Sequence, residues 1–167
     1  MNTNVNSPTE SINAVTFVTT EEFLEHWQGH RRLTRKMIEM YPDDKLFTYS
    51  IGGMRPFAEL VMEMVDMAEH GIVGIVSDEW PTMQRSVYPT SKEGILELWD
   101  KVTSDLDAQW PNIPPQRFHE VTLAFGQYEG TVFSTIFYFI DNEIHHRGQG
   151  YVYLRSLGIE PPYFWER

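Results

Sequence analysis

The chain has 167 residues, of which 41% are hydrophobic, so it is long enough for one domain with a real core and too apolar to be disordered. Its formal net charge of −11 repels phosphate backbones, which disfavours nucleic-acid binding. It has no cysteine, which excludes disulfides, thiolate metal sites and a cysteine nucleophile. We find neither a signal-peptide pattern nor a run of about 20 apolar residues, and we therefore expect no membrane partner and a cytoplasmic location.

Polar residues dominate positions 1–17, and we expect a disordered tail there, followed by one domain at 18–167. A first helix is predicted to begin at Thr19, because Thr19 and Glu22 form a capping-box pattern. It should end near Tyr41, which precedes a proline.

Two features of this first helix bear on function. His26 and His30 lie four residues apart, which is a metal-ligand spacing but is also common by chance on an exposed face. The basic cluster Arg31, Arg32, Arg35 and Lys36 is interpreted as the polar side of the helix.

A second helix is predicted from about Pro56 through residue 76, with a buried apolar stripe. Glu63, Asp66 and His70 share a different face of it. This face is either solvated and acidic, or it directs Glu63 or His70 inward as a ligand. A third helix is predicted from a capping box at Thr90 to about residue 109.

A long connection, residues 110–130, precedes the last helix, and 118–125 within it is a candidate strand. Connections of this length are unusual in a compact bundle and often border a functional site. Four helices with long connections predict an all-α four-helix bundle.

The last helix is predicted from about residue 131 to residue 157 and has two faces. The apolar stripe consists of Phe133, Phe137, Ile140, Ile144, Tyr151 and Leu154. The polar face consists of Asn142, His146, Gln149 and Tyr153. Because residues four apart lie above one another, Asn142 and His146 can point to one place, either as ligands or as a hydrogen-bonded polar layer. His145 should point away.

Three neighbours of His146 have structural interpretations. Arg147 is interpreted as an ion-pairing residue of the helix surface or an interface. Gly148 and Gly150 each cost about 1 kcal/mol relative to alanine inside a helix, which indicates close approach of another helix or chain. A dimer interface would explain them, and helix flexibility is the alternative. No GxSxG, P-loop, GxGxxG or HExxH motif occurs.

The segment NEIHHRGQGYVYLRSLGIEPP resembles the final-helix signature of the DinB/YfiT-like superfamily, HxxHHRGQ followed by YLRxLGxxPP. The segments 23–41, 54–60 and 121–123 resemble other parts of that family in the same order. The resemblance covers about residues 17–165. It implies an up-down-down-up four-helix bundle, a homodimer, and a divalent metal held by three histidines. It also implies a thiol-dependent transferase or isomerase, using a low-molecular-weight thiol such as bacillithiol or mycothiol, or a hydrolase.

The resemblance places the three metal ligands on Glu63, Asn142 and His146 of this chain. Only His146 keeps the family's histidine, so the site would be richer in oxygen. Such a site should bind Zn²⁺ or Ni²⁺ less well and favour Mn²⁺, Fe²⁺ or Mg²⁺, or no metal. Alternatively, Glu63 and His146 contact each other directly in place of the ion, as a base and its orienting group or as a structural pair.

Two functions follow from these residues. The first is a metal-dependent S-transferase or hydrolase in which Glu63, Asn142 and His146 hold the ion and the ion activates water or a thiol. The second is a metal-free protein that binds a small molecule or a partner without catalysis. Direct contact between Glu63 and His146 would favour the second.

Overall fold

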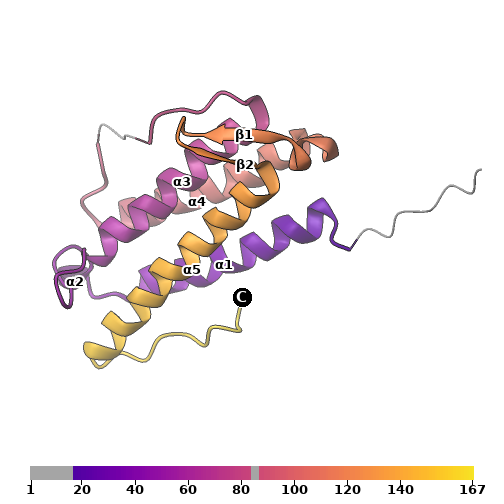
Figure 1. Ribbon diagram of the computed structural model, residues 1–167. Coiled ribbons are helices and arrows are strands. Elements are labelled where there is room, and N and C mark those ends of the chain that lie inside the picture. The colour runs from indigo at the N-terminus through magenta and orange to yellow at the C-terminus, as the bar shows by residue number, and fades with distance from the viewer. Residues whose placement is uncertain (1–16, 84–86) are drawn as a thin grey trace, which may run out of the picture.

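The computed structural model describes residues 17–83 and 87–167, so all but the last residue of the expected tail at 1–17 lies outside the described residues. The long helices are α1 (Thr20–Met40), α3 (Phe57–Ser77), α4 (Lys92–Gln109) and α5 (Val132–Ser156). Helices α1 and α5 run in one direction, and α3 and α4 run in the other (Figure 1). The predicted up-down-down-up bundle is confirmed.

The helices enclose one core. Helix α3 packs against α4 and α5, and α1 packs against the same two helices, so α1 and α3 lie diagonally opposite each other. The interior is rich in large side chains, as the aromatic content indicates, and it includes Trp27, Phe57, Trp99 and Ile140. Of the helices in the described ranges, none is long and apolar enough to cross a membrane.

The helix ends agree with the sequence patterns with one exception. The capping box of α1 is present, because the Thr19 N–H donates to Glu22 at 2.8 Å and the Glu22 N–H donates to Thr19 at 3.1 Å. The capping box predicted at Thr90 is wrong. The hydroxyl of Ser91 accepts the N–H of Gly94 at 3.1 Å, so α4 begins one residue later than expected.

Two of the connections between the long helices contain short structured elements. Helix α2 (Asp43–Leu46) lies between α1 and α3. Between α4 and α5 lie the 3-10 helices η1 (Trp110–Asn112) and η2 (Pro115–His119) and an antiparallel hairpin of β1 (Val121–Ala124) and β2 (Tyr128–Thr131). The candidate strand at 118–125 is therefore confirmed for its second half. Strand β2 was not predicted, because its four residues show no hydrophobic alternation.

The buried face of α5 differs from the predicted apolar stripe. Phe133, Phe137 and Ile144 are 42%, 37% and 39% exposed, whereas Ile140 and Leu154 are buried as expected. The face that packs inward also contains polar residues, and it consists of Ile136, Phe139, Ile140, Glu143, His146, Arg147, Gly150, Tyr153 and Leu154.

Two arginines also lie deeper than their sequence patterns predict. Arg147 was expected to form an ion pair at the helix surface or at an interface. The ion pair is present, with Glu143 at 3.7 Å, but the surface position is wrong, because the residue is 5% exposed. The assignment of Arg31 to the polar side of α1 is also wrong, because this residue has no exposed surface. The carboxylate of Glu143 lies between the two guanidinium groups and compensates their buried charge. It also accepts a hydrogen bond from the Thr34 hydroxyl at 2.6 Å.

Candidate functional site

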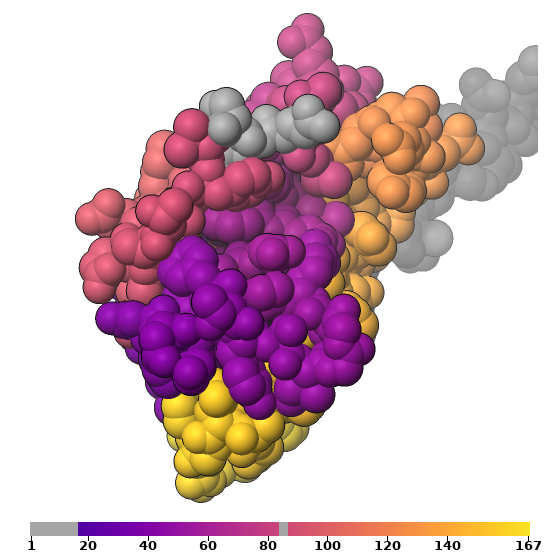
Figure 2. Space-filling view, turned by 90° about the vertical axis from the view of Figure 1, so that its left-hand side faces the viewer, coloured from indigo at the N-terminus to yellow at the C-terminus, as the bar shows by residue number. Residues whose placement is uncertain are grey.

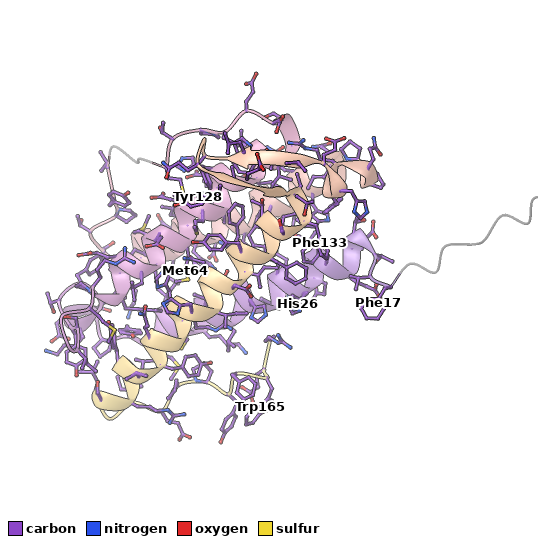
Figure 3. All side chains as sticks on the ribbon, in the orientation of Figure 1. Phe17, His26, Met64, Tyr128, Phe133 and Trp165 are labelled. Atoms are coloured by element: carbon purple, nitrogen blue, oxygen red, sulfur yellow. The ribbon has the colours of Figure 1, made fainter. Side chains whose placement is uncertain are left out.

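A carboxylate of α3 and an imidazole of α5 meet where these two helices pack together. Oε1 of Glu63 lies 2.9 Å from Nε2 of His146. The His146 side chain is 8% exposed and that of Glu63 is 30% exposed, so the pair lies at the edge of the core. In Figure 3, Met64 marks the position next to Glu63, on the part of α3 beside α5. The structure thus brings these two predicted residues into direct contact.

A third residue, Arg55, contacts the other oxygen of the carboxylate. Its guanidinium donates to Oε2 of Glu63 at 2.6 Å. Its backbone carbonyl accepts a hydrogen bond from the Tyr153 hydroxyl at 3.0 Å, which ties the segment before α3 to α5. Burial raises the pKa of Glu63, but the hydrogen bonds from His146, Arg55 and Asn142 outweigh it and lower that pKa to about 2.

Two amide side chains of α5 complete the cluster. The Nδ2 group of Asn142 donates to Oε1 of Glu63 at 3.0 Å. The Nδ1 atom of His146 lies 2.9 Å from Oε1 of Gln149, one turn further along the helix. Every member of the predicted polar face of α5 therefore contributes to one network around Glu63. The Oδ1 atom of Asn142 is buried and has no hydrogen-bond partner among the described residues.

These residues fit a divalent metal only in part. Gln149 holds Nδ1 of His146 so that Nε2 faces Glu63, which is how ligand histidines are oriented. However, both oxygens of Glu63 already accept hydrogen bonds, and the guanidinium of Arg55 supplies the positive charge. Within the described ranges, no group of three His, Cys, Asp or Glu side chains is placed to hold an ion. The arrangement matches a hydrogen-bonded ion pair better than a metal site.

A cavity of about 510 Å³ opens beside Glu63 and Arg55, within the size range of small-molecule sites. Its apolar wall consists of Phe47, Ala58, Met62, Met83 and Pro89, and its polar wall also includes Glu59, Asp66 and Tyr88. The Tyr88 hydroxyl donates to Asp66 at 3.0 Å. Figure 2 faces this side of the molecule, where the surface is hollowed between the purple residues around α2 and the pink segment before α4.

The remaining predicted residues lie in other places. His145 is exposed on α5, as expected. His26 is exposed and His30 is buried. Their rings pack edge to face, with the ring centroids 4.8 Å apart. His30 contacts Arg147 rather than the network around Glu63. His70 has a buried Nδ1 atom without a partner among the described residues and does not line the cavity.

Arg55 is the member of the network that sequence reasoning missed. It lies outside the helices, so helical spacing does not associate it with Glu63 or His146. The available signal was a cation just before the N-terminus of α3 and eight residues before Glu63. Side chains that far apart meet only when the connector folds back over the first turns of its helix.

The depressed pKa of Glu63 predicts a pH dependence of stability. Because the folded-state pKa is about 2 and the ordinary value is 4.5, the ionised carboxylate stabilises the fold above about pH 4.5, and this contribution disappears as the pH falls toward 2. We expect Glu63→Gln to be less stable than wild type at pH 7, and we expect this deficit to be much smaller, although still measurable, at pH 2.5. Urea unfolding at both pH values measures this, with exposed Glu97→Gln as the control. An equal deficit at both pH values would contradict the ion pair.

Comparisons with known proteins agree with this fold. The family model of the DinB family matches residues 1–166. A DinB-like protein from Bacillus cereus ATCC 10987 has 21% identity and a TM-score of 0.69, and the match covers 90% of this chain and 100% of that one. A DinB-like protein, YjoA, from Bacillus subtilis has 17% identity and a TM-score of 0.69, covering 87% and 99%. No curated protein matches the chain. On the family match and the shared bundle, this chain belongs to the DinB family.

Proposed function

We propose that this chain is a metal-free member of its family that binds a small organic amine in the cavity beside Glu63. The observation that supports a metal-free site is the position of Arg55, whose guanidinium lies 2.6 Å from Glu63 and provides the positive charge that a metal would otherwise supply. Loading an ion onto Glu63 would require breaking this contact and the hydrogen bonds from Asn142 and His146.

The walls of the cavity support an amine as the ligand. Glu59 and Glu63 line it together with one cation, Arg55, which contacts Glu63, so these two carboxylates lie beside a single cation among the described lining residues. The apolar wall of the same cavity includes Phe47 and Met62. An aromatic or aliphatic amine would match both kinds of lining residue, because its ammonium group would contact the carboxylates and its hydrocarbon part would cover the apolar surface.

Metal content tests the first half of the proposal. We expect protein purified without chelator or affinity-tag nickel to contain no stoichiometric metal, even after incubation with Mn²⁺, Zn²⁺ and Ni²⁺. Elemental analysis of wild type and His146→Ala measures this. Near-stoichiometric metal that is lost in the variant would overturn the proposal and place the ion on Glu63, Asn142 and His146.

Ligand binding tests the second half. We expect phenethylamine to bind saturably in an NMR titration, and phenethyl alcohol, which lacks the charge, to bind much more weakly. Glu59→Gln should weaken the amine by about threefold to tenfold, because a charged hydrogen-bond acceptor is lost. Glu97→Gln, in exposed surface on α4, is the matched control. Equal binding of amine and alcohol would rule out this ligand class.

A metal-dependent thiol transferase or hydrolase is the second candidate. The hydrogen bond between Gln149 and Nδ1 of His146 favours it, because it leaves Nε2 as the atom facing Glu63. In that case Glu63, Asn142 and His146 would hold the ion, which would supply an activated water or thiol. Arg55→Met should then raise the affinity for Mn²⁺ or Zn²⁺, since the competing cation is removed.

A further inference from the structure

A second cavity, of about 390 Å³, lies between α1, α5 and the segment that follows α5. This segment turns back along α5 and ends beside α1 (Figure 1). Its last residue packs on α1, because a Cβ placed on Gly29 would lie 3.2 Å from Cβ of Arg167. In Figure 3, Trp165 and His26 mark the segment and the nearby part of α1. The cavity is separate from the network around Glu63.

Two guanidinium groups in this cavity face one imidazole. Nη2 of Arg147 lies 2.9 Å from Nδ1 of His30, and Nη1 of Arg167 lies 3.0 Å from Nε2 of the same ring. A neutral imidazole accepts a hydrogen bond at one nitrogen and carries a proton on the other. In one of the two contacts, a guanidinium N–H donor therefore faces the N–H donor of the imidazole, and no hydrogen bond can form there. Donors outnumber acceptors at this point.

The local charge is positive in an otherwise acidic protein. Burial, together with the charges of Arg147, His26 and Arg167, lowers the pKa of His30 to about 3, so this ring is neutral and offers no compensating charge. The carboxylate of Glu143 lies 3.7 Å from Arg147 but is shared with the fully buried Arg31. A second carboxylate, Glu166, acts on Tyr151 from the segment after α5. The formal net charge of the whole chain is −11, so this cluster of cations is a local exception.

A further donor and an apolar wall line the same cavity. The hydroxyl of Tyr151 is buried and has no hydrogen-bond partner among the described residues. A buried hydroxyl without a partner is destabilising, and an acceptor in the cavity would remove this cost. Ile144, Gly148 and Phe164 line the rest of the cavity with apolar surface.

We propose that this cavity binds the carboxylate group of a small aromatic or aliphatic acid. Arg147 and Arg167 supply guanidinium groups, whose planar donors match the two oxygens of a carboxylate. The Tyr151 hydroxyl supplies a third donor, and the apolar wall covers the body of the acid. The acid removes the donor-against-donor contact at His30, because it accepts the hydrogen bonds that the ring cannot accept.

Benzoate is a suitable probe, with benzamide as its uncharged counterpart. We expect a two-dimensional NMR titration of the full chain to show saturable shifts of the Gly148 and Gly29 amides with benzoate, and much smaller shifts with benzamide. Arg167→Met should weaken benzoate by about tenfold, since a charged hydrogen-bond donor is lost. Tyr151→Phe should weaken it by about threefold. Lys45→Met, which removes one exposed cation on α2, is the matched control and should bind like wild type.

Three outcomes would overturn this proposal. The first is the absence of benzoate shifts at these glycines. The second is equal benzoate affinity in wild type and Arg167→Met, both of them folded by circular dichroism. The third is inorganic phosphate binding more tightly than benzoate with the same dependence on Arg167, which would assign the site to another anion. None of these outcomes depends on metal or amine binding beside Glu63, so the two sites are tested independently.

Discussion

Replacement of Glu143 by alanine is expected to destabilise the bundle by about 3–5 kcal/mol. Glu143 is 2% exposed and lies between Arg31 and Arg147, whose guanidinium nitrogens are 3.9 Å and 3.7 Å from its carboxylate. Without it, two buried cations lose the charge that compensates them. The Thr34 hydroxyl loses its hydrogen bond to the carboxylate as well. Urea unfolding at pH 7 measures the free energy of unfolding.

Two further variants separate charge from packing at this position. Glu143→Gln keeps the shape and an oxygen that accepts from Thr34, so we expect it to be less destabilising than alanine but clearly below wild type. Glu97→Ala removes an exposed carboxylate from α4 and should change stability by no more than about 0.5 kcal/mol. A Glu143→Ala loss as small as that of the Glu97 control would show that the buried arginines do not require this carboxylate.

The existence, order and most ends of the four long helices were predictable from the sequence, because they depend on local signals, whereas the short helices α2, η1 and η2 were not predicted. The capping box at Thr19 and the left-handed Gly158, with φ of +76°, delimit α1 and α5 as expected. The buried face of α5 was not predictable in the same way. Hydrophobic periodicity places Phe133 and Phe137 inside, whereas the structure leaves both partly exposed and buries the charged residues Glu143 and Arg147. This burial depends on ion pairing with α1, which no local pattern contains.

The candidate site was predictable to the extent that it lies on helices. Spacing on α5 grouped Asn142, His146 and Gln149, and the family resemblance connected Asn142 and His146 with Glu63. Arg55 was not predictable, since its contact with Glu63 depends on the path of an irregular connector. This one residue changes the interpretation of the site, because a carboxylate beside a guanidinium no longer needs an ion to compensate its charge.

The glycines of α5 were expected to mark the close approach of another helix or chain, and the structure separates their roles. A Cβ on Gly150 would lie 2.4 Å from the Phe57 ring, so the neighbour at this position is α3 of the same chain. A Cβ on Gly148 would meet nothing within 4 Å. Gly150 therefore needs no partner chain to explain it. The homodimer implied by the family resemblance stays a prediction, which light scattering in solution would test.

Alanine at these two glycines should have effects of opposite sign. Gly150→Ala is expected to destabilise the protein by about 1–3 kcal/mol, because the new methyl group displaces the ring of Phe57. This ring is fully buried and stacks on the Tyr41 ring, with the two ring centroids 4.5 Å apart. Gly148→Ala is expected to stabilise it by about 0.5–1 kcal/mol, because alanine favours the helix and the added methyl group has room.

The two variants can be compared directly, because Gly148 and Gly150 lie two residues apart in one helix and receive the same substitution. Helix propensity contributes equally to both, so the difference between the two free energies of unfolding isolates the contact with Phe57. The backbone carbonyl of Gly150 also accepts the Tyr41 hydroxyl at 2.8 Å, so any shift of the helix away from the ring weakens this bond too. If both variants were stabilised, α5 would not approach α3 as closely as described. If both were destabilised, Gly148 would contact something beyond the described chain, and a second copy of the protein would be the first candidate.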